Sequence, residues 1–297
     1  MIHLAIVAGV LAISFSAIFV RLAGVSPDTS AFFRTFYALP ALLVLWLALG
    51  SRRVSPRLVG LALASGLAFG LDLVFWHRAI QWIGAGLATV LGNIQVVLVG
   101  LAAWLLYGER PRNTVFAGVA LAFAGMILVS GLGRPEAYGD DPPRGAIFGL
   151  LTAIMYTLFL LLLRRSTRDE ATPFGAFFLS TLAATLTIGA IGGLGGSLEL
   201  AWSWPAHGWL LALALGSQVA GWLLISYALP RLPAVESSVL LLLQPAATLL
   251  WAFLVFGEDL SALQWLGVLA VMTGVALPAL GGARQRRRAK EIGPSRI

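Results

Sequence analysis

Long apolar stretches recur along the whole chain, and their length limits what the chain can fold into. Each has about 20 residues, which as a helix crosses the roughly 30 Å hydrocarbon layer of a membrane. Lipid offers the backbone no hydrogen-bond partners, so such stretches must be helical. The sequence therefore predicts an all-α polytopic membrane protein. We expect ten transmembrane helices, over residues 2–20, 30–49, 58–80, 84–106, 114–131, 145–163, 173–195, 207–228, 235–256 and 262–281.

The composition excludes a water-soluble protein. Of the residues, 59% are hydrophobic and only 11% are charged, whereas soluble domains average about 25% charged residues. The chain has no cysteine, which excludes disulfides and thiolate metal ligands. We expect no metal and no cofactor. The net charge of +7 does not indicate a nucleic-acid partner here, because the placement of the basic residues relative to the membrane is what matters.

The two halves of the chain resemble each other. Small or polar residues recur 149 positions apart, as in the pairs Gln95 and Gln244, and Gly118 and Gly267. A repeat of this length favours a duplicated membrane bundle rather than a solenoid. We expect two inverted five-helix repeats. The predicted units are a first repeat over 1–132, an outer linker over 133–144, a second repeat over 145–281 and a basic cytoplasmic tail over 282–297.

The basic residues predict the orientation in the membrane. Fifteen of them lie in the tail and in the loops of one predicted side, whereas only Arg134 and Arg144 lie in loops of the other. Loops rich in arginine and lysine stay in the cytoplasm. We therefore expect a multi-pass protein of the inner or plasma membrane with both termini cytoplasmic. The tail fixes this topology, and an alternative role is binding of anionic lipids.

Several fragments resemble a known family. SFSAIFVRLAGVSPDTSAFFR, LDLVFWHRAI, AGLATVLGNIQVVLVGLAAWLLYGERP and GVALAFAGMILVSG are similar to segments of the EamA family of the drug/metabolite transporter superfamily. The EamA unit is present twice. The resemblance implies ten helices, five plus five inverted, around a central substrate cavity. It also implies export of amino acids or other small metabolites, and leaves a homodimer as an open alternative.

Charged side chains inside apolar segments are costly and are therefore candidates for function. Asp72 lies within 58–80, Trp76 follows one helical turn later with His77 beside it, and Arg34 lies at a similar depth in 30–49. These groups could bind the charged ends of a substrate. Asp72 and His77 are also candidates for proton coupling. The alternative for Arg34 and Asp72 is a structural ion pair between neighbouring helices.

Further polar and aromatic residues lie within the apolar segments. Gln95 and Gln244 form a repeat-related pair with Asn93 nearby, and could line the cavity or join helices by hydrogen bonds. Tyr156 and Trp104 are aromatic candidates for substrate contact, with core or lipid packing as the alternative.

Two repeat-related carboxylates precede predicted helices. Glu109 and Glu258 come just before 114–131 and 262–281. A carboxylate stabilises the positive end of a helix. We therefore expect both residues to be structural helix caps.

These features favour a secondary transporter that alternates access to a midplane site. No Walker motif is present, so ATP is not the direct energy source. We expect a small-molecule substrate and the lipid bilayer as partners, with proton coupling and facilitated diffusion both open. A drug-like cation or a nucleotide sugar is the alternative substrate. An enzyme would need a nucleophile with its base or a motif such as HExxH, and a channel would need a filter-like loop; the sequence favours neither.

Overall fold

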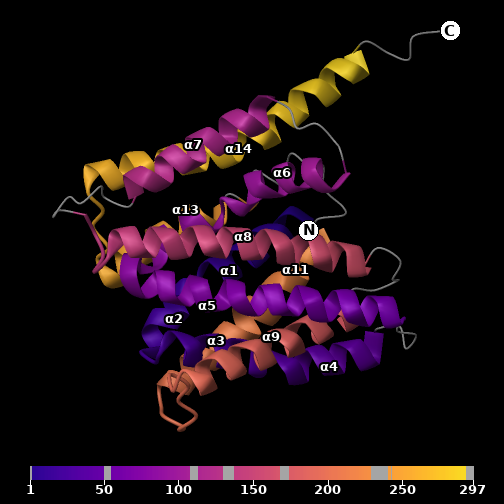
Figure 1. Cartoon of the computed structure of the whole chain (residues 1–297), viewed down its shortest axis with the longest axis vertical. Helices are drawn as coiled ribbons and strands as arrows, with labels where there is room; N and C mark the ends of the chain where they lie inside the picture. The colour runs from indigo at the N-terminus through magenta and orange to yellow at the C-terminus, as the bar shows by residue number, and fades with distance from the viewer. Residues whose placement is uncertain are drawn as a thin grey trace.

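The protein is a bundle of helices (Figure 1). The computed structural model describes residues 2–49, 55–107, 113–129, 137–167, 174–228, 240–241 and 243–291. All the regular elements within these ranges are helical. The helices are α1 (Ile2–Ser14), α2 (Ser16–Ala23), α3 (Pro27–Phe36), α4 (Ala38–Leu49), α5 (Pro56–Gly92), α6 (Gln95–Tyr107), α7 (Asn113–Val129), α8 (Pro142–Thr167), α9 (Phe174–Leu194), α10 (Ala206–Ala212), the π-helix η2 (Leu213–Gly221), α11 (Trp222–Ala228), α13 (Leu243–Phe256) and α14 (Ala262–Glu291).

The described helices are long and apolar enough for several membrane crossings. Six stretches meet this condition by length and composition: Ile2–Ala23, Pro27–Leu49, Pro56–Val99, Pro142–Leu163, Phe174–Leu194 and Ala206–Ile225. Three shorter apolar helices accompany them, over Asn113–Val129, Leu243–Phe256 and Ala262–Leu277. The predicted class, a helical multi-pass membrane protein, agrees with this composition of elements.

One apolar stretch is too long for a single crossing. Pro56–Val99 has 44 residues, which at about 1.5 Å per residue is about twice the thickness of the hydrocarbon layer. It turns at Gly84, whose backbone has φ 79° and ψ 172°. Only glycine adopts such angles readily. The chain therefore reverses between the two predicted segments 58–80 and 84–106.

Other apolar segments are interrupted in mid-course, which hydropathy does not predict. The first breaks at Phe15, between α1 and α2, and the second breaks at Tyr37, between α3 and α4. Pro40 explains the second break, since a proline ring removes a helical hydrogen bond and clashes with the carbonyl four residues earlier. A third break separates α5 from α6 at Asn93, whose side-chain amide donates to the Thr89 carbonyl at 2.8 Å.

The last helix runs further than the predicted segment. We expected the membrane helix to end at residue 281 and a tail to follow, but α14 continues to Glu291. The added turns are rich in alanine, glutamine, arginine and lysine, all of which are good helix formers. Residues 292–297 of the predicted tail lie outside the described residues.

Helices α7 and α14 pack directly against each other through glycines (Figure 1). A Cβ atom on Gly125 would lie 2.6 Å from the Gly267 carbonyl oxygen, and one on Gly274 would lie 2.6 Å from the Gly118 carbonyl oxygen. Small residues allow membrane helices to approach closely. Because Gly118 and Gly267, and Gly125 and Gly274, are repeat-related pairs, the two contacts are reciprocal.

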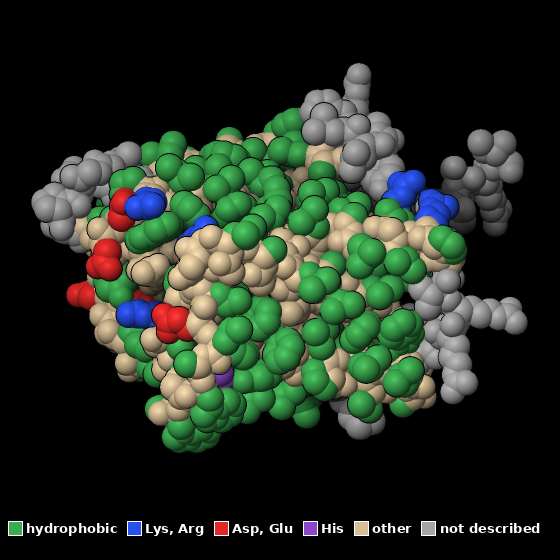
Figure 2. Space-filling model, turned by 60° about the horizontal axis from the view of Figure 1, so that its bottom comes forward, with side chains coloured by type: hydrophobic (Ala, Val, Ile, Leu, Met, Phe, Trp, Pro, Cys, Tyr) green, Lys and Arg blue, Asp and Glu red, His purple; other side chains and the backbone are tan. Residues whose placement is uncertain are grey.

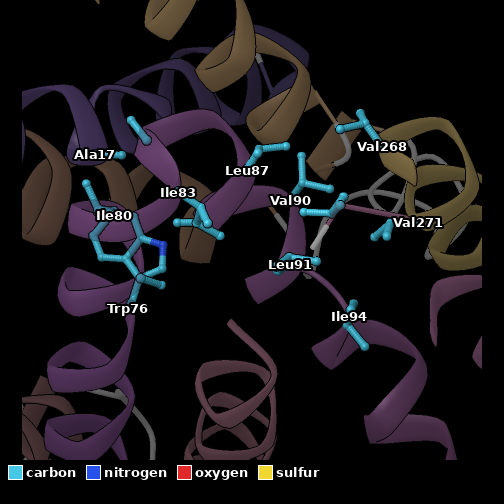
Figure 3. Packing of buried hydrophobic residues seen from close by; sticks show 14 of the residues in the cluster. Ala17, Trp76, Ile80, Ile83, Leu87, Val90, Leu91, Ile94, Val268 and Val271 are labelled. Atoms are coloured by element: carbon cyan, nitrogen blue, oxygen red, sulfur yellow. The ribbon is translucent and has the colours of Figure 1, made fainter. Parts of the chain in front are cut away.

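A continuous apolar core lies between α2, α5 and α14 (Figure 3). Ala17, Ile80, Ile83 and Leu87 have at most 3% of their surface exposed. Val268 and Val271 of α14 extend this core on its far side (Figure 3).

Carboxylates gather at one end of the bundle. We call it the Glu258 end, and define it by Arg21 near the end of α2, Gly84 at the turn of α5, and Glu258 before α14. In Figure 2 the red carboxylates appear at the left together with some blue basic side chains, whereas the right end shows blue side chains and no red ones among its described residues. Exposed Arg57 and Arg165 lie at that opposite end, where α5 begins and α8 ends.

Candidate functional site

A central cavity of about 480 Å³ lies among the helices. It is within the size range of small-molecule sites. Segments from both halves of the chain contribute to its walls, namely α1, α2, α3, α5, α6, α8, α11, α13 and α14. Its polar lining residues are Ser16, Arg34, Asp72, Thr89, Asn93, Gln95, Thr152, Tyr156 and Gln244.

Arg34 is the buried cation of this cavity. It lies on α3, and only 5% of its surface is exposed. Its Nε–H donates to the side-chain oxygen of Gln218 at 2.9 Å. Its guanidinium carbon lies 5.4 Å from the centre of the Trp76 ring, within the range of cation–π attraction. One edge of the guanidinium is therefore fixed, and Arg34 still lines the cavity.

Asp72 is the buried anion of the same cavity. It lies on α5 with 5% of its surface exposed. The salt bridges between described residues are Arg21–Glu258 and Arg78–Asp28, so Arg34 and Asp72 do not form the direct pair considered from the sequence. Both charges line the same cavity without forming a salt bridge with each other. Arg34 is held by Gln218 instead.

The predicted amides meet at the cavity. Asn93, Gln95 and Gln244 all line it. Asn93 and Gln95 lie at the break between α5 and α6, and Gln244 lies in the first turn of α13. Broken helices place backbone and side-chain polar groups at membrane depth, where they can bind a substrate.

Two of the three predicted aromatic residues line the central cavity. Trp76 and Tyr156 line the cavity, and the Tyr156 ring stacks on Phe159 at 6.0 Å between centres. Trp104 lies on α6, but its side chain is outside the described residues.

His77 lines a second cavity, not the central one. This outer cavity, as we call it, has a volume of about 460 Å³ and is lined by residues that include Arg21, Ser30, His77 and Tyr138. The Nδ1 atom of His77 lies 3.3 Å from the Ser30 hydroxyl and 3.2 Å from the Pro27 carbonyl. Trp76 and His77 are adjacent in α5 but line different cavities.

Glu258 is at a helix N-terminus, but not that of the helix we expected. Its carboxylate accepts the backbone N–H of Ala85 at 2.7 Å and of Gly86 at 3.1 Å, in the first turn after the Gly84 reversal. The start of α14 is capped by Ser261, which accepts the Gln264 N–H. Gly257, with φ 65°, turns the chain so that Glu258 points away from its own helix. Glu109 lies outside the described residues.

Sequence reasoning missed Gln218 and Thr152. Gln218 is fully buried in the π-helix η2, a type of helix often found at functional sites. The Ser16 and Thr152 hydroxyls line the cavity and have no hydrogen-bond partner among the described residues. Gln218 could have been found from the sequence, because it is a glutamine inside an apolar segment, as Gln95 is. A metal-binding group of His, Asp or Glu does not occur within the described residues.

A family model matches the chain twice. The EamA-like transporter family matches residues 1–131 and again residues 143–279. Each match covers a little under half of the chain.

Individual relatives match between about a quarter and about seven-tenths of the chain. The uncharacterized protein PA1977 of Pseudomonas aeruginosa is 33% identical over 67% of each chain. The uncharacterized transporter YwfM of Bacillus subtilis is 24% identical over 71% of this chain and 70% of that protein. A probable 4-amino-4-deoxy-L-arabinose-phosphoundecaprenol flippase subunit, ArnE of Yersinia pestis, is 35% identical over 27% of this chain and 69% of its own.

A crystal structure shares the fold. It superposes with a TM-score of 0.63 over 96% of this chain and 98% of its own, at 19% identity. This similarity concerns the arrangement of helices alone.

Proposed function

Since this chain belongs to the EamA-like transporter family, we propose that it is a secondary transporter that moves a small zwitterionic metabolite by alternating access. The substrate class we propose is an amino acid or a related compound with an apolar part. The central cavity is the binding site. The two repeats rock about it, so that it opens to one side of the membrane at a time.

The observation that carries this proposal is the pair of opposite charges in one cavity. Arg34 and Asp72 are both 5% exposed, and neither neutralises the other by direct contact. A buried charge without a partner is costly. A substrate with a carboxylate and an ammonium group would satisfy both residues at once. The nearby rings of Trp76 and Tyr156 suit an apolar side chain on that substrate.

We propose ten crossings in two inverted halves. Support comes from the reciprocal glycine contacts between α7 and α14, in which Gly118 meets Gly274 and Gly125 meets Gly267. A twofold axis relating two equivalent helices gives this pattern, because each contact is repeated with the partners exchanged. The double match of the family model supports the same duplication.

We place the Glu258 end outside the cell and both termini in the cytoplasm. The carboxylates of the Glu258 end and the arginines of the opposite end support this orientation (Figure 2). Export is the direction we propose for the physiological substrate. Asp72 and His77 remain our candidates for coupling transport to protons.

Counterflow in proteoliposomes tests the proposal. Vesicles loaded with unlabelled L-leucine should accumulate radiolabelled L-leucine, whereas protein-free vesicles should not. Two analogues serve as matched controls: 4-methylpentanoate lacks the ammonium group and 3-methylbutylamine lacks the carboxylate. Both should compete at least tenfold less well than L-leucine, because each leaves one buried charge unpaired. L-phenylalanine tests a larger apolar part.

Two results would contradict the substrate class. Equal competition by 3-methylbutylamine would favour a drug-like cation, and the presence of Arg34 argues against that reading. Absence of counterflow with either amino acid would turn attention to larger sugar-linked substrates, which the name of the ArnE relative suggests for that protein.

A further inference from the structure

Glu258 joins three segments that line the central cavity. Its carboxylate accepts two N–H groups from the helical segment Ala85–Gly92 of α5 and forms a salt bridge with Arg21 of α2 at 2.5 Å. Glu258 itself is separated from the end of α13 by Gly257 alone. The cavity is lined by Thr89 and Gly92 of the first segment, Ser16 of α2 and Gln244 of α13.

The contact is built into the fold around a buried carboxylate. The side chain of Glu258 is 2% exposed. A Cβ atom on Gly84 would lie 2.5 Å from its Oε1 atom, so this position admits only glycine. Arg21 is further held by Phe256, whose ring centre lies 4.1 Å from the guanidinium carbon, and by the Tyr138 hydroxyl at 3.4 Å.

The same segments seal the central cavity from the outer cavity. Arg21 and Gly84 line the outer cavity, whereas Thr89, on the same stretch of helix as Ala85, lines the central one. Ala17, Ile83 and Leu87 of these two segments are essentially unexposed and belong to one apolar cluster (Figure 3). Separation of α2 from the Ala85–Gly92 segment would open this apolar layer.

We propose that Glu258 is a positioning residue for alternating access, and that its contacts with Arg21, Ala85 and Gly86 hold the cavity closed at the Glu258 end. This inference rests on the proposed transport function. The carboxylate acts through the segments that it joins and does not touch the substrate. Weakening the contacts shifts the population toward the state open at the Glu258 end.

Thiol labelling measures the closure without requiring transport. The chain has no cysteine of its own, so a Ser16→Cys variant reports on the central cavity alone. A membrane-impermeant maleimide is applied from the Glu258 side, in vesicles of known orientation. Glu258→Gln should raise the labelling rate by on the order of tenfold, because a hydrogen-bonded buried charge is lost.

The neighbouring acid provides the control. Asp259 is exposed and carries the same charge, so Asp259→Asn should leave the labelling rate unchanged. Arg21→Gln should raise the labelling rate as Glu258→Gln does. Arg21→Lys keeps the positive charge, so its labelling rate should stay close to that of the parent. If Glu258→Gln does not fold, Arg21→Gln tests the same contact. In that variant the Glu258 carboxylate can still accept the N–H groups of Ala85 and Gly86.

Substrate affinity distinguishes positioning from simple stabilisation. With L-leucine as the probe, Glu258→Gln should lower the half-saturation concentration from the Glu258 side and raise it from the opposite side, since apparent affinity follows the population of each open state. Folded Glu258→Gln or Arg21→Gln protein that is labelled at the parental rate would overturn the proposal. Altered labelling in a protein that transports no amino acid would leave the closure standing and refute the substrate class.

Discussion

Arg34 donates its Nε–H to the side-chain oxygen of Gln218 at 2.9 Å, joining α3 to the π-helix η2 across 184 residues of sequence. This bond fixes one edge of the guanidinium and leaves the rest of the group beside the cavity. The Nε2 atom of Gln218 is buried without a partner among the described residues. Through its side-chain oxygen, Gln218 positions the cation that we assign to the substrate carboxylate.

Replacing Gln218 should therefore separate stability from binding. Gln218→Met keeps the shape but removes the acceptor, and should lower the free energy of unfolding by about 1–3 kcal/mol because Arg34 loses a buried partner. Gln218→Glu keeps an acceptor and should preserve the melting temperature. Its added charge should neutralise Arg34 and raise the half-saturation concentration for L-leucine. Thermal unfolding in detergent and counterflow measure the two effects; parental affinity in Gln218→Glu would contradict the role of Arg34.

The two cavity charges should select the two ends of the substrate. Asp72→Asn should weaken competition by L-leucine on the order of tenfold while leaving that of 4-methylpentanoate nearly unchanged. Arg34→Gln should likewise weaken competition by L-leucine, but it should leave competition by 3-methylbutylamine nearly unchanged, because this amine has no carboxylate for Arg34 to bind. The measurement is competition against labelled L-leucine. Parallel losses for all three compounds in both variants would point to a structural pair instead.

Proton coupling should depend on Asp72 and His77. An imposed pH gradient should drive L-leucine uptake by the parent protein if these groups carry protons. The double variant Asp72→Asn, His77→Ala should lose this driven component, because neither position then titrates. Exchange at equal pH separates coupling from binding. Transport by the double variant that equals that of the parent would contradict the assignment of these sites.

The glycine contact between α7 and α14 should tolerate no side chain. A methyl group at Gly125 would lie 2.6 Å from the Gly267 carbonyl oxygen, so Gly125→Ala should cost about 1–3 kcal/mol of stability through overpacking. Gly60 of α5 provides the control, since nothing lies within 4 Å of the same added atom. There the alanine should stabilise the helix by up to about 1 kcal/mol. Thermal unfolding of the two variants should give shifts of opposite sign.

A second ion pair should stabilise the Glu258 end. Asp28 accepts two hydrogen bonds from Arg78, at 2.9 and 3.1 Å, and one from the Ser197 hydroxyl. It thereby joins α3, α5 and the segment after α9. Asp28→Asn should lower the free energy of unfolding by about 1–3 kcal/mol. The exposed Glu199 supplies a matched control as Glu199→Gln, which should leave the melting temperature unchanged.

Much of the site could be anticipated because a polar residue in an apolar segment stands out. Arg34, Asp72, Asn93, Gln95 and Gln244 were all selected on that signal, and all line the central cavity. His77 gave the same signal but lines the outer cavity. Position along a helix does not say which of two stacked cavities a side chain meets, since that depends on the neighbouring helix.

Glu258 shows the same limit for a helix cap. A carboxylate before an apolar segment predicts a cap on that segment. The structure instead has Glu258 on the N–H groups of Ala85 and Gly86, 173 and 172 residues earlier in the chain. The left-handed backbone of Gly257 turns the carboxylate away, and Gly84 leaves the space that receives it. Local rules cannot foresee a partner of this kind.

The sequence by itself determined that the chain is built of apolar helices suited to a membrane, and it predicted a duplication of the bundle. Apolar segments of membrane length can only be helices in lipid, and small and polar residues recurring at a fixed spacing indicate a repeat. Only the tertiary structure decided which polar groups share a cavity, that Gln218 rather than Asp72 holds Arg34, and that Glu258 joins α2, α5 and α13. The physical reason is that the hydrophobicity of a segment depends on its own residues alone. Hydrogen bonds between segments depend on how the helices break, turn and pack.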